Sequence, residues 1–330
     1  MQLMDCTLRD GANVVGKGFS AELTEMMIKG LIACGITIIE MGNALGVGAY
    51  DSGSVSPLTD EEYLEILRAY RDQAEIGMFM GVKNAVPRYI DRAVKGGAHF
   101  LRIGANAGDG ADALEGIKYV KKSGIKAYYS LMKGYILSPK ELAEEALRLE
   151  ECGLDSITIM DSAGTMMPAA VADYVGEMSS RLRIPVGFHG HNNLGLSVAN
   201  ALAAQKAGAQ LLDCGLLGMA RSAGNLATEL AVAAFQRESL CGEVDLYSLL
   251  DFLDSELIPA MQPYGYHTAV TPLDLIYGLA GCHSSFEQRF AEVAQQKGVP
   301  LYRLIVEVSA VDRKNPSAEL MERVADRIKG

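Results

Sequence analysis

The sequence predicts an α/β protein: a (β/α)8 TIM barrel followed by a small helical C-terminal domain. Short apolar runs alternate with longer amphipathic segments, which is typical of parallel strands covered by helices. There are eight such runs, the strand count of a closed barrel, and a chain of 330 residues suits one barrel with an appendage. The runs are 2–7, 36–42, 75–81, 99–104, 125–132, 156–162, 184–191 and 211–218.

Capping residues mark the ends of the helices between these runs. Ser20 precedes the first amphipathic segment and Gly35 follows it. The segment after the fifth run has Ser138 as its cap, Pro139 at its first helical position and Gly153 at its end. An open, doubly wound sheet is the alternative fold. The sequence DGANVVGKG after the first run lacks the GxGxxG spacing that a dinucleotide-binding sheet would use.

The alternation of strands and helices stops after Glu238, and residues 245–330 are predicted to be mostly helical. We therefore expect two regions. Residues 1–258 would form the barrel that carries the functional site, and residues 259–330 a helical C-terminal region that covers this site.

Charge and composition argue against several classes of function. A formal net charge of −11 disfavours binding to nucleic acid or to an anionic lipid surface. No apolar run of about 18 residues is present, and the N-terminus lacks the pattern of a signal peptide, so we expect no contact with a membrane. The six cysteines show no CxxC spacing, which is typical of reduced, buried thiols in a cytoplasmic protein.

In such a barrel, functional residues lie at the carboxyl ends of the strands. His189 and His191 end the seventh run, and their spacing of two directs both side chains toward the barrel interior. Asp10 follows the first run. In a closed barrel the first strand lies next to the eighth, and the seventh strand is one position further around. Two imidazoles, a carboxylate and open water positions predict a divalent-metal site. The alternative is that both histidines only hydrogen-bond backbone groups.

Other polar residues follow the remaining strands. Arg9 at the catalytic face needs an anionic partner. In the structural interpretation this partner is Glu40 or Asp10. In the functional interpretation it is the enolate oxygen that develops during the reaction. Asp161 follows the sixth run and either contacts the substrate or caps the next segment. Asn225 follows the eighth run, at the end of the sequence MARSAGN.

Taken together, these residues resemble the DRE-TIM metallolyase, or HMGL-like, family. The resemblance rests on TLRDG at 7–11, Glu40 after the second strand and HGHN at 189–192, in that order. It implies a divalent ion held by Asp10, the two histidines and, as in some members, Asn225. Substrate oxygens and water would complete an octahedron, which favours Mn²⁺ or Mg²⁺ over Zn²⁺.

The C-terminal region narrows the resemblance to one branch. Residues 275–299 look like the segment that covers the active site in the 4-hydroxy-2-oxovalerate aldolases. This likeness implies a carbon–carbon lyase that cleaves a 4-hydroxy-2-oxo acid to pyruvate and an aldehyde through a metal-bound enolate. Arg9, Glu40 and Asp161 would bind the substrate. Such aldolases can pair with an aldehyde dehydrogenase, and a homodimer is the other assembly we consider.

Two positions depart from the aldolase pattern. Asn13 stands where that branch has a catalytic histidine, and His283 stands where it has a tyrosine. An amide cannot take a proton at neutral pH, so we expect His283 to act as the base beside the catalytic Arg9. The alternative is that His283 is solvated or caps the helix that begins with HSSFEQ.

Two other functions share these motifs. One is a Claisen-type condensing enzyme that uses an acyl-CoA, similar to isopropylmalate synthase or HMG-CoA lyase. The other is a barrel that has lost catalysis, for which Asn13 is the best support.

Overall fold

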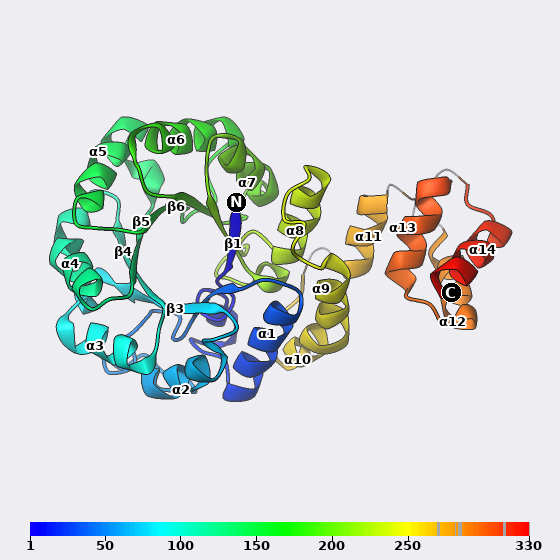
Figure 1. Cartoon of the computed structure of the whole chain (residues 1–330), viewed down its shortest axis with the longest axis horizontal. Coiled ribbons are helices and arrows are strands. Elements are labelled where there is room, and N and C mark those ends of the chain that lie inside the picture. Colours follow the sequence, from blue (N-terminus) through cyan, green and yellow to red (C-terminus); the bar gives the residue numbers. More distant parts are fainter. Residues whose placement is uncertain (269–270, 281, 283–285, 313–314, 330) are drawn as a thin grey trace.

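The computed structural model describes the chain apart from residues 269–270, 281, 283–285, 313–314 and 330. Eight parallel strands close into a barrel in chain order, and the first pairs with the eighth, so the predicted fold class is confirmed (Figure 1). The strands are β1 (Gln2–Asp5), β2 (Ile38–Met41), β3 (Glu75–Gly81), β4 (Phe100–Asn106), β5 (Lys126–Met132), β6 (Ser156–Asp161), β7 (Val186–Gly190) and β8 (Leu211–Cys214).

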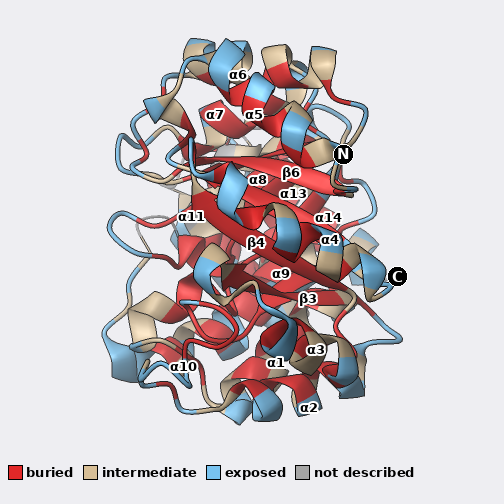
Figure 2. Ribbon diagram, turned by 90° about the vertical axis from the view of Figure 1, so that its left-hand side faces the viewer, coloured by how far each residue is buried: buried red, intermediate tan, exposed pale blue. Residues whose placement is uncertain are grey.

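A ring of helices surrounds the barrel (Figure 1). The two predicted caps are present: Ser20 accepts a hydrogen bond from the Leu23 amide, and Ser138 forms a capping box with Glu141. Figure 2 shows the strands as buried and the outer helix faces as exposed. The helices of the ring are α1 (Ala21–Ala33), α2 (Asp60–Tyr70), α3 (Pro87–Gly96), α4 (Leu114–Lys122), α5 (Pro139–Glu150), α6 (Pro168–Arg181), α7 (Ser197–Lys206) and α8 (Thr228–Arg237).

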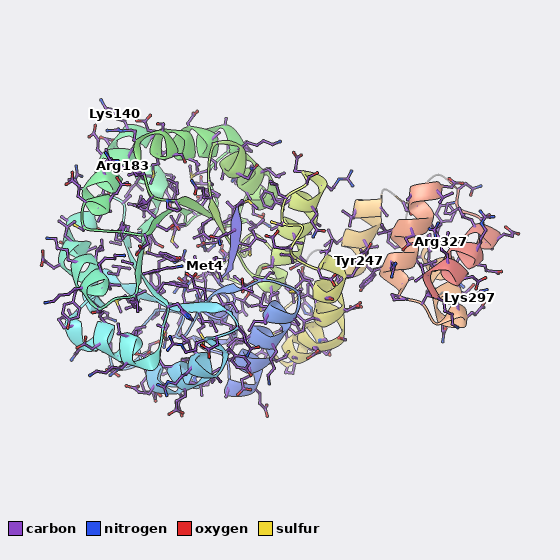
Figure 3. The ribbon with its side chains drawn as sticks, viewed as in Figure 1. Met4, Lys140, Arg183, Tyr247, Lys297 and Arg327 are labelled. Carbon is purple, nitrogen blue, oxygen red and sulfur yellow. The ribbon has the colours of Figure 1, made fainter. Side chains whose placement is uncertain are left out.

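Apolar side chains fill the amino-terminal half of the barrel interior. Phe100 and Tyr128 stack there with ring centroids 4.7 Å apart, and Met4 lies inside the ring of strands (Figure 3). These side chains close one end of the barrel, so a ligand can enter only from the carboxyl ends of the strands. The cluster consists of Met4, Cys6, Ile38, Phe100, Tyr128 and Leu211.

The last helices extend from one side of the barrel. α9 (Leu246–Phe252), a π-helical turn (Leu253–Leu257) and α10 (Ile258–Met261) pack near α1 and α8. Figure 1 shows the four helices that follow outside the ring, beside α8 and α9 rather than over an end of the barrel. That residues 259–330 cover the active site therefore stays a prediction. These helices are α11 (Pro272–Ala280), α12 (Glu287–Lys297), α13 (Leu301–Val311) and α14 (Ala318–Lys329).

Hydrogen bonds of described residues tie this region to the barrel. The Tyr266 hydroxyl donates to the Leu217 carbonyl at 2.9 Å, in the loop after β8, and Arg237 of α8 donates to the Leu279 carbonyl at 2.9 Å. The connection to the C-terminal helices thus passes beside the carboxyl end of β8. In the described part of the chain, no helix combines the length and apolarity needed to cross a bilayer.

Glu229 is a buried acid behind the loop after β8. Its Oε2 accepts a hydrogen bond from the Leu217 amide at 3.1 Å, whereas Oε1 has no partner among the described residues. Burial raises the pKa of Glu229 from 4.5 to about 7. The folded protein therefore holds this proton more tightly than the unfolded chain. Its contribution to stability is complete below pH 4.5 and is lost as the pH rises through about 7.

We expect Glu229→Gln to weaken the pH dependence of stability, because the amide does not titrate. The free energy of unfolding, from urea titrations between about pH 5 and pH 8, should fall less steeply with pH in this variant than in the wild type. The exposed Glu256 provides the control, since Glu256→Gln should keep the wild-type slope. An unchanged slope in Glu229→Gln would contradict the assignment.

Candidate active site

A cavity of about 270 Å³ opens at the carboxyl ends of the strands. Four of the predicted site residues line it, namely Arg9, Asp10, His189 and His191. Side chains from β3, β5 and β6 and from the loops after β2 and β8 complete its wall. The full lining is Arg9, Asp10, Ala44, Leu45, Phe79, Met132, Met160, Ser162, His189, His191, Arg221 and Ser222.

The three predicted metal-ligand side chains converge in this cavity. The ligand atoms of Asp10, His189 and His191 all lie within 4.8 Å of one another. Asp10 Oδ2 is 3.6 Å from His189 Nε2 and 3.9 Å from His191 Nε2. The barrel order brings them together, because β8 pairs with both β1 and β7, as the sequence predicts. One carboxylate and two imidazoles are a donor set that a divalent ion accepts.

Asn225 stands beside this set. Its Nδ2 donates to Asp10 Oδ2 at 2.8 Å, and its backbone forms an antiparallel bridge with His191. Its Oδ1 is buried and has no hydrogen-bond partner among the described residues, and neither has Nδ1 of His191. A buried acceptor without a donor is uncommon, and a bound cation would satisfy the amide oxygen. The residues present therefore fit a divalent ion.

Local electrostatics keep the ligands in the states that a metal requires. Burial raises the pKa of Asp10, but the charge of Arg9, then that of His189, and the Asn225 hydrogen bond outweigh it. The pKa consequently lies well below its ordinary value, and the carboxylate stays charged. Burial lowers the pKa of His191 to about 4, so its ring is neutral at physiological pH and can donate a lone pair.

A chain of buried charges supports the ligands from behind. Arg9 bonds Asp10 Oδ1 through Nη1 at 3.0 Å and Glu40 Oε1 through Nε at 2.5 Å. Arg102 in turn bonds Glu40 Oε2 through Nε and Asp213 Oδ2 through Nη1, both at 2.5 Å. Glu40 is completely buried between the two guanidinium groups and does not line the cavity. Its direct contact is with the two arginines, and its role on the substrate stays a prediction.

The other end of this chain of ion pairs contacts His189, one of the predicted metal ligands. Asp213 Oδ2 lies 3.0 Å from His189 Nδ1, which leaves Nε2 facing Asp10. A carboxylate on the second ring nitrogen fixes the orientation of a metal-binding histidine. Cys6, His189 and Asp213 form a second cluster, but Arg102 contacts both Cys6 and Asp213. The guanidinium thus already supplies a cation there.

Arg9 has the ion pairs of the structural interpretation, and its role toward an enolate stays a prediction. It is paired with Glu40 and Asp10, and it stacks 4.7 Å from the ring centroid of Phe79. Its Nη2 is nevertheless buried without a partner among the described residues. Since Arg9 lines the cavity, this nitrogen is a candidate donor for an anionic ligand.

Asp161 and Asn13 have local partners instead. Asp161 is completely buried, and its two oxygens accept hydrogen bonds from the Thr165 and Met166 amides at 3.0 and 2.9 Å. Both amides lie in the loop before α6, whose N-cap is Met167, so Asp161 holds this loop and does not cap the helix. Asp161 does not line the cavity, and its role on the substrate stays a prediction. Asn13 donates to the Asp10 carbonyl at 2.9 Å and accepts from Lys17 at 3.0 Å.

The remaining histidines do not belong to the ligand cluster, or lie outside the described residues. His283 belongs to the undescribed residues, so its predicted role as the base stays a prediction. His99 precedes β4 and accepts from the Ile76 amide at 3.1 Å, at the opposite end of the barrel. His267 is exposed.

Sequence reasoning missed two kinds of site residue. Arg102 and Asp213 lie within buried strands, and the signal that could have found them is a charge in an apolar run, which needs a buried partner. Arg221 and Ser222 line the cavity from the loop after β8. They stand in the same segment as Asn225, MARSAGN.

A family model described as HMGL-like matches residues 1–255. The chain belongs to the HMGL-like family. Among relatives in this family, 4-hydroxy-2-oxovalerate aldolase 2 of Nocardia farcinica is 31% identical over 99% of this chain and 94% of its own length. The 4-hydroxy-2-oxovalerate aldolase of Carboxydothermus hydrogenoformans is 30% identical over 98% of this chain and 96% of its own length. The predicted family is thus confirmed.

The barrel is also similar to solved structures of more distant proteins. The hydroxymethylglutaryl-CoA lyase of Pseudomonas aeruginosa has a TM-score of 0.67 at 16% identity, covering 85% of this chain and 98% of its own. At this identity, the likeness shows the shared barrel fold alone.

We expect His189→Ala or His191→Ala to weaken Mn²⁺ binding by more than about 100-fold, beyond the usual effect of losing a group behind a ligand. The barrel should stay folded, because Asp213 keeps its bond to Arg102 when His189 is removed. Isothermal titration calorimetry measures the affinity, and circular dichroism checks the fold. His267→Ala should bind like the wild type. Wild-type affinity in either ligand variant would show that the site is misassigned.

Proposed function

We propose that this protein is a divalent-metal-dependent aldolase that cleaves a 4-hydroxy-2-oxo acid to pyruvate and an aldehyde. The observation that carries the proposal is the convergence of Asp10, His189 and His191 beside the unpaired Nη2 of Arg9. The names of relatives at about 31% identity support the same reaction. Mn²⁺ or Mg²⁺ suits the donor set, because substrate oxygens and water can fill an octahedron.

Four side chains of the candidate site would hold the ion. Asp10, His189 and His191 are the ligands, and Asn225 adds an amide oxygen. A divalent ion held there would supply a Lewis acid that polarises the keto group of the substrate. Asp213 would orient His189 so that Nε2 stays available for binding.

Arg9 would stabilise the negative charge that forms during cleavage. As the C3–C4 bond breaks, its electron pair moves into the pyruvate half, and the keto oxygen gains negative charge. Nη2 is held in place by the pairs of Arg9 with Glu40 and Asp10, so the donor needs no reorganisation at that moment. Phe79, Met132 and Met160 provide apolar walls around the same cavity.

A base must remove the proton from the C4 hydroxyl, and we assign this task to His283. Asn13 cannot serve, because an amide does not accept a proton at neutral pH. Two of the remaining histidines are candidate ligands, His99 lies at the opposite end of the barrel, and His267 is exposed. Pyruvate then forms when its enolate takes up one proton at C3, which completes the reaction.

The products of this reaction indicate the kind of partner enzyme that would use them. The aldehyde would be the substrate of an aldehyde dehydrogenase, which is the partner class we propose alongside a second copy of this chain. We place the enzyme in the cytoplasm. The function is tested by metal-dependent exchange of the pyruvate C3 protons in D₂O and by cleavage of 4-hydroxy-2-oxopentanoate. Absence of both activities with Mn²⁺ and Mg²⁺ would refute the proposal.

Arg9→Lys keeps the charge but loses the planar fork that contacts Glu40 and Asp10. We expect kcat for cleavage to fall about 100-fold or more, the scale on which a single oxyanion donor acts. The rate of pyruvate proton exchange, followed by NMR, should fall with it. Arg183→Lys at an exposed position should leave both rates unchanged (Figure 3). An unaltered exchange rate in Arg9→Lys would argue against the enolate role.

His283→Ala should lower cleavage by about 10²- to 10⁴-fold, the usual span for a general base, without weakening Mn²⁺ binding. The acidic limb of the kcat/KM profile should flatten, because protonation of the imidazole near pH 6.5 would no longer stop the reaction. His267→Ala is the matched control and should retain the wild-type profile. Near-normal turnover of His283→Ala with the wild-type profile would assign the base to another group.

A further inference from the structure

A second cavity adjoins the metal-side cavity at the mouth of the barrel. It has a volume of about 700 Å³ and lies over the carboxyl ends of β3 and β4. Leu45 and Met132 line both cavities, so they are neighbours across these two side chains. We call the larger cavity, lined by Leu45, Gly81, Lys83, Ala105, Asp112 and Met132 among others, the distal groove.

The distal groove lies across the barrel from the candidate metal ligands. Asp10 follows β1, and His189 and His191 come from the end of β7, whereas the groove sits over β3 and β4. In a closed barrel of eight strands taken in chain order, β3 and β4 face β7 and β8. A 2-oxo acid held at the ligands through its C1 and C2 oxygens therefore has the groove open to its other end.

We propose that the distal groove binds the C4 substituent of the substrate, and that this substituent is an uncharged, hydroxyl-bearing chain longer than a methyl group. The substrate class is then a 2-oxo-3-deoxy aldonic acid, which is a 4-hydroxy-2-oxo acid with a polyol tail. This inference rests on the proposed aldolase function and names the substrate of the same site.

The side chains around the groove fit an uncharged polar chain. Leu45, Ala105 and Met132 give apolar contact, while Asp109, Asp112 and Lys83 are exposed at its solvent side. Carboxylates accept hydrogen bonds from hydroxyl groups, and the lysine ammonium donates to them. Because two carboxylates face one ammonium here, a negatively charged tail is disfavoured relative to a neutral one.

Gly81, the last residue of β3, keeps the groove open. A Cβ built there meets no atom within 4 Å, so the space beside it is free. Its φ of −69° and ψ of 147° suit any residue, so the backbone does not require glycine. The other two glycines of the lining differ: Gly53 has a φ of 91°, and a Cβ on Gly104 would lie 2.5 Å from the Phe79 ring. Close approach of a ligand accounts for Gly81.

The test fills this space and compares substrates. Gly81→Leu should lower kcat/KM for 2-oxo-3-deoxygluconate by about 10- to 200-fold, the scale on which pockets discriminate by size. It should leave pyruvate proton exchange and cleavage of 4-hydroxy-2-oxopentanoate close to wild type, because neither probe reaches the groove. Gly81→Ala should lie between wild type and Gly81→Leu. Gly176→Leu in α6, where a Cβ also meets nothing within 4 Å, is the matched control and should change neither activity.

The second part of the test compares substrates of the wild-type enzyme. This enzyme should prefer 2-oxo-3-deoxygluconate to the methyl substrate and to a carboxylate-tailed substrate, 4-hydroxy-2-oxoglutarate. Preference for either of the latter two, or an equal loss of pyruvate exchange in Gly81→Leu, would overturn the inference while leaving the aldolase proposal in place. Lack of pyruvate exchange and of all cleavage in the wild type would instead overturn the proposed function, and this inference with it.

Discussion

The functional end of this barrel depends on one chain of buried ion pairs, running from Asp10 through Arg9, Glu40 and Arg102 to Asp213. Three carboxylates and two guanidinium groups leave one net negative charge. A divalent cation would turn that into a net positive charge, which attracts an anionic 2-oxo acid. Because each member is desolvated, removing one would leave its neighbour as an uncompensated buried charge.

This chain of ion pairs also positions the metal-ligand side chains. Its two ends act on the ligand cluster, since Asp10 belongs to it and Asp213 orients His189. In the strands between them, Glu40 and Arg102 are completely buried. The apolar side chains around Phe100 and Tyr128 lie between the ion pairs and the amino-terminal end of the barrel. In such surroundings, charge interactions are stronger than in solvent.

Much of this architecture is visible in the sequence, and the reasons for the omissions are physical. Eight apolar runs, TLRDG and HGHN give the barrel and the ligand cluster, because strand ends in a barrel meet at one face. The roles of Arg102 and Asp213 cannot be predicted in this way, because they lie inside strands and their partners lie on other strands. The partners of Asp161 could not be decided in advance, because they are amides of the loop after β6 and depend on the path of that loop. The space beside Gly81 depends on loops that only the folded chain brings together.

The backbone bridge between His191 and Asn225 joins the loops after β7 and β8 on the metal-binding side of the barrel mouth, so these two loops are linked to each other. The loops over β3 and β4 are outside that bridge. The two halves of the mouth can therefore diverge independently: mutations in the far loops can retune which aldehyde is released without disturbing how the bond is broken. A barrel built this way can change the substituent that it accepts while its ligand cluster stays the same.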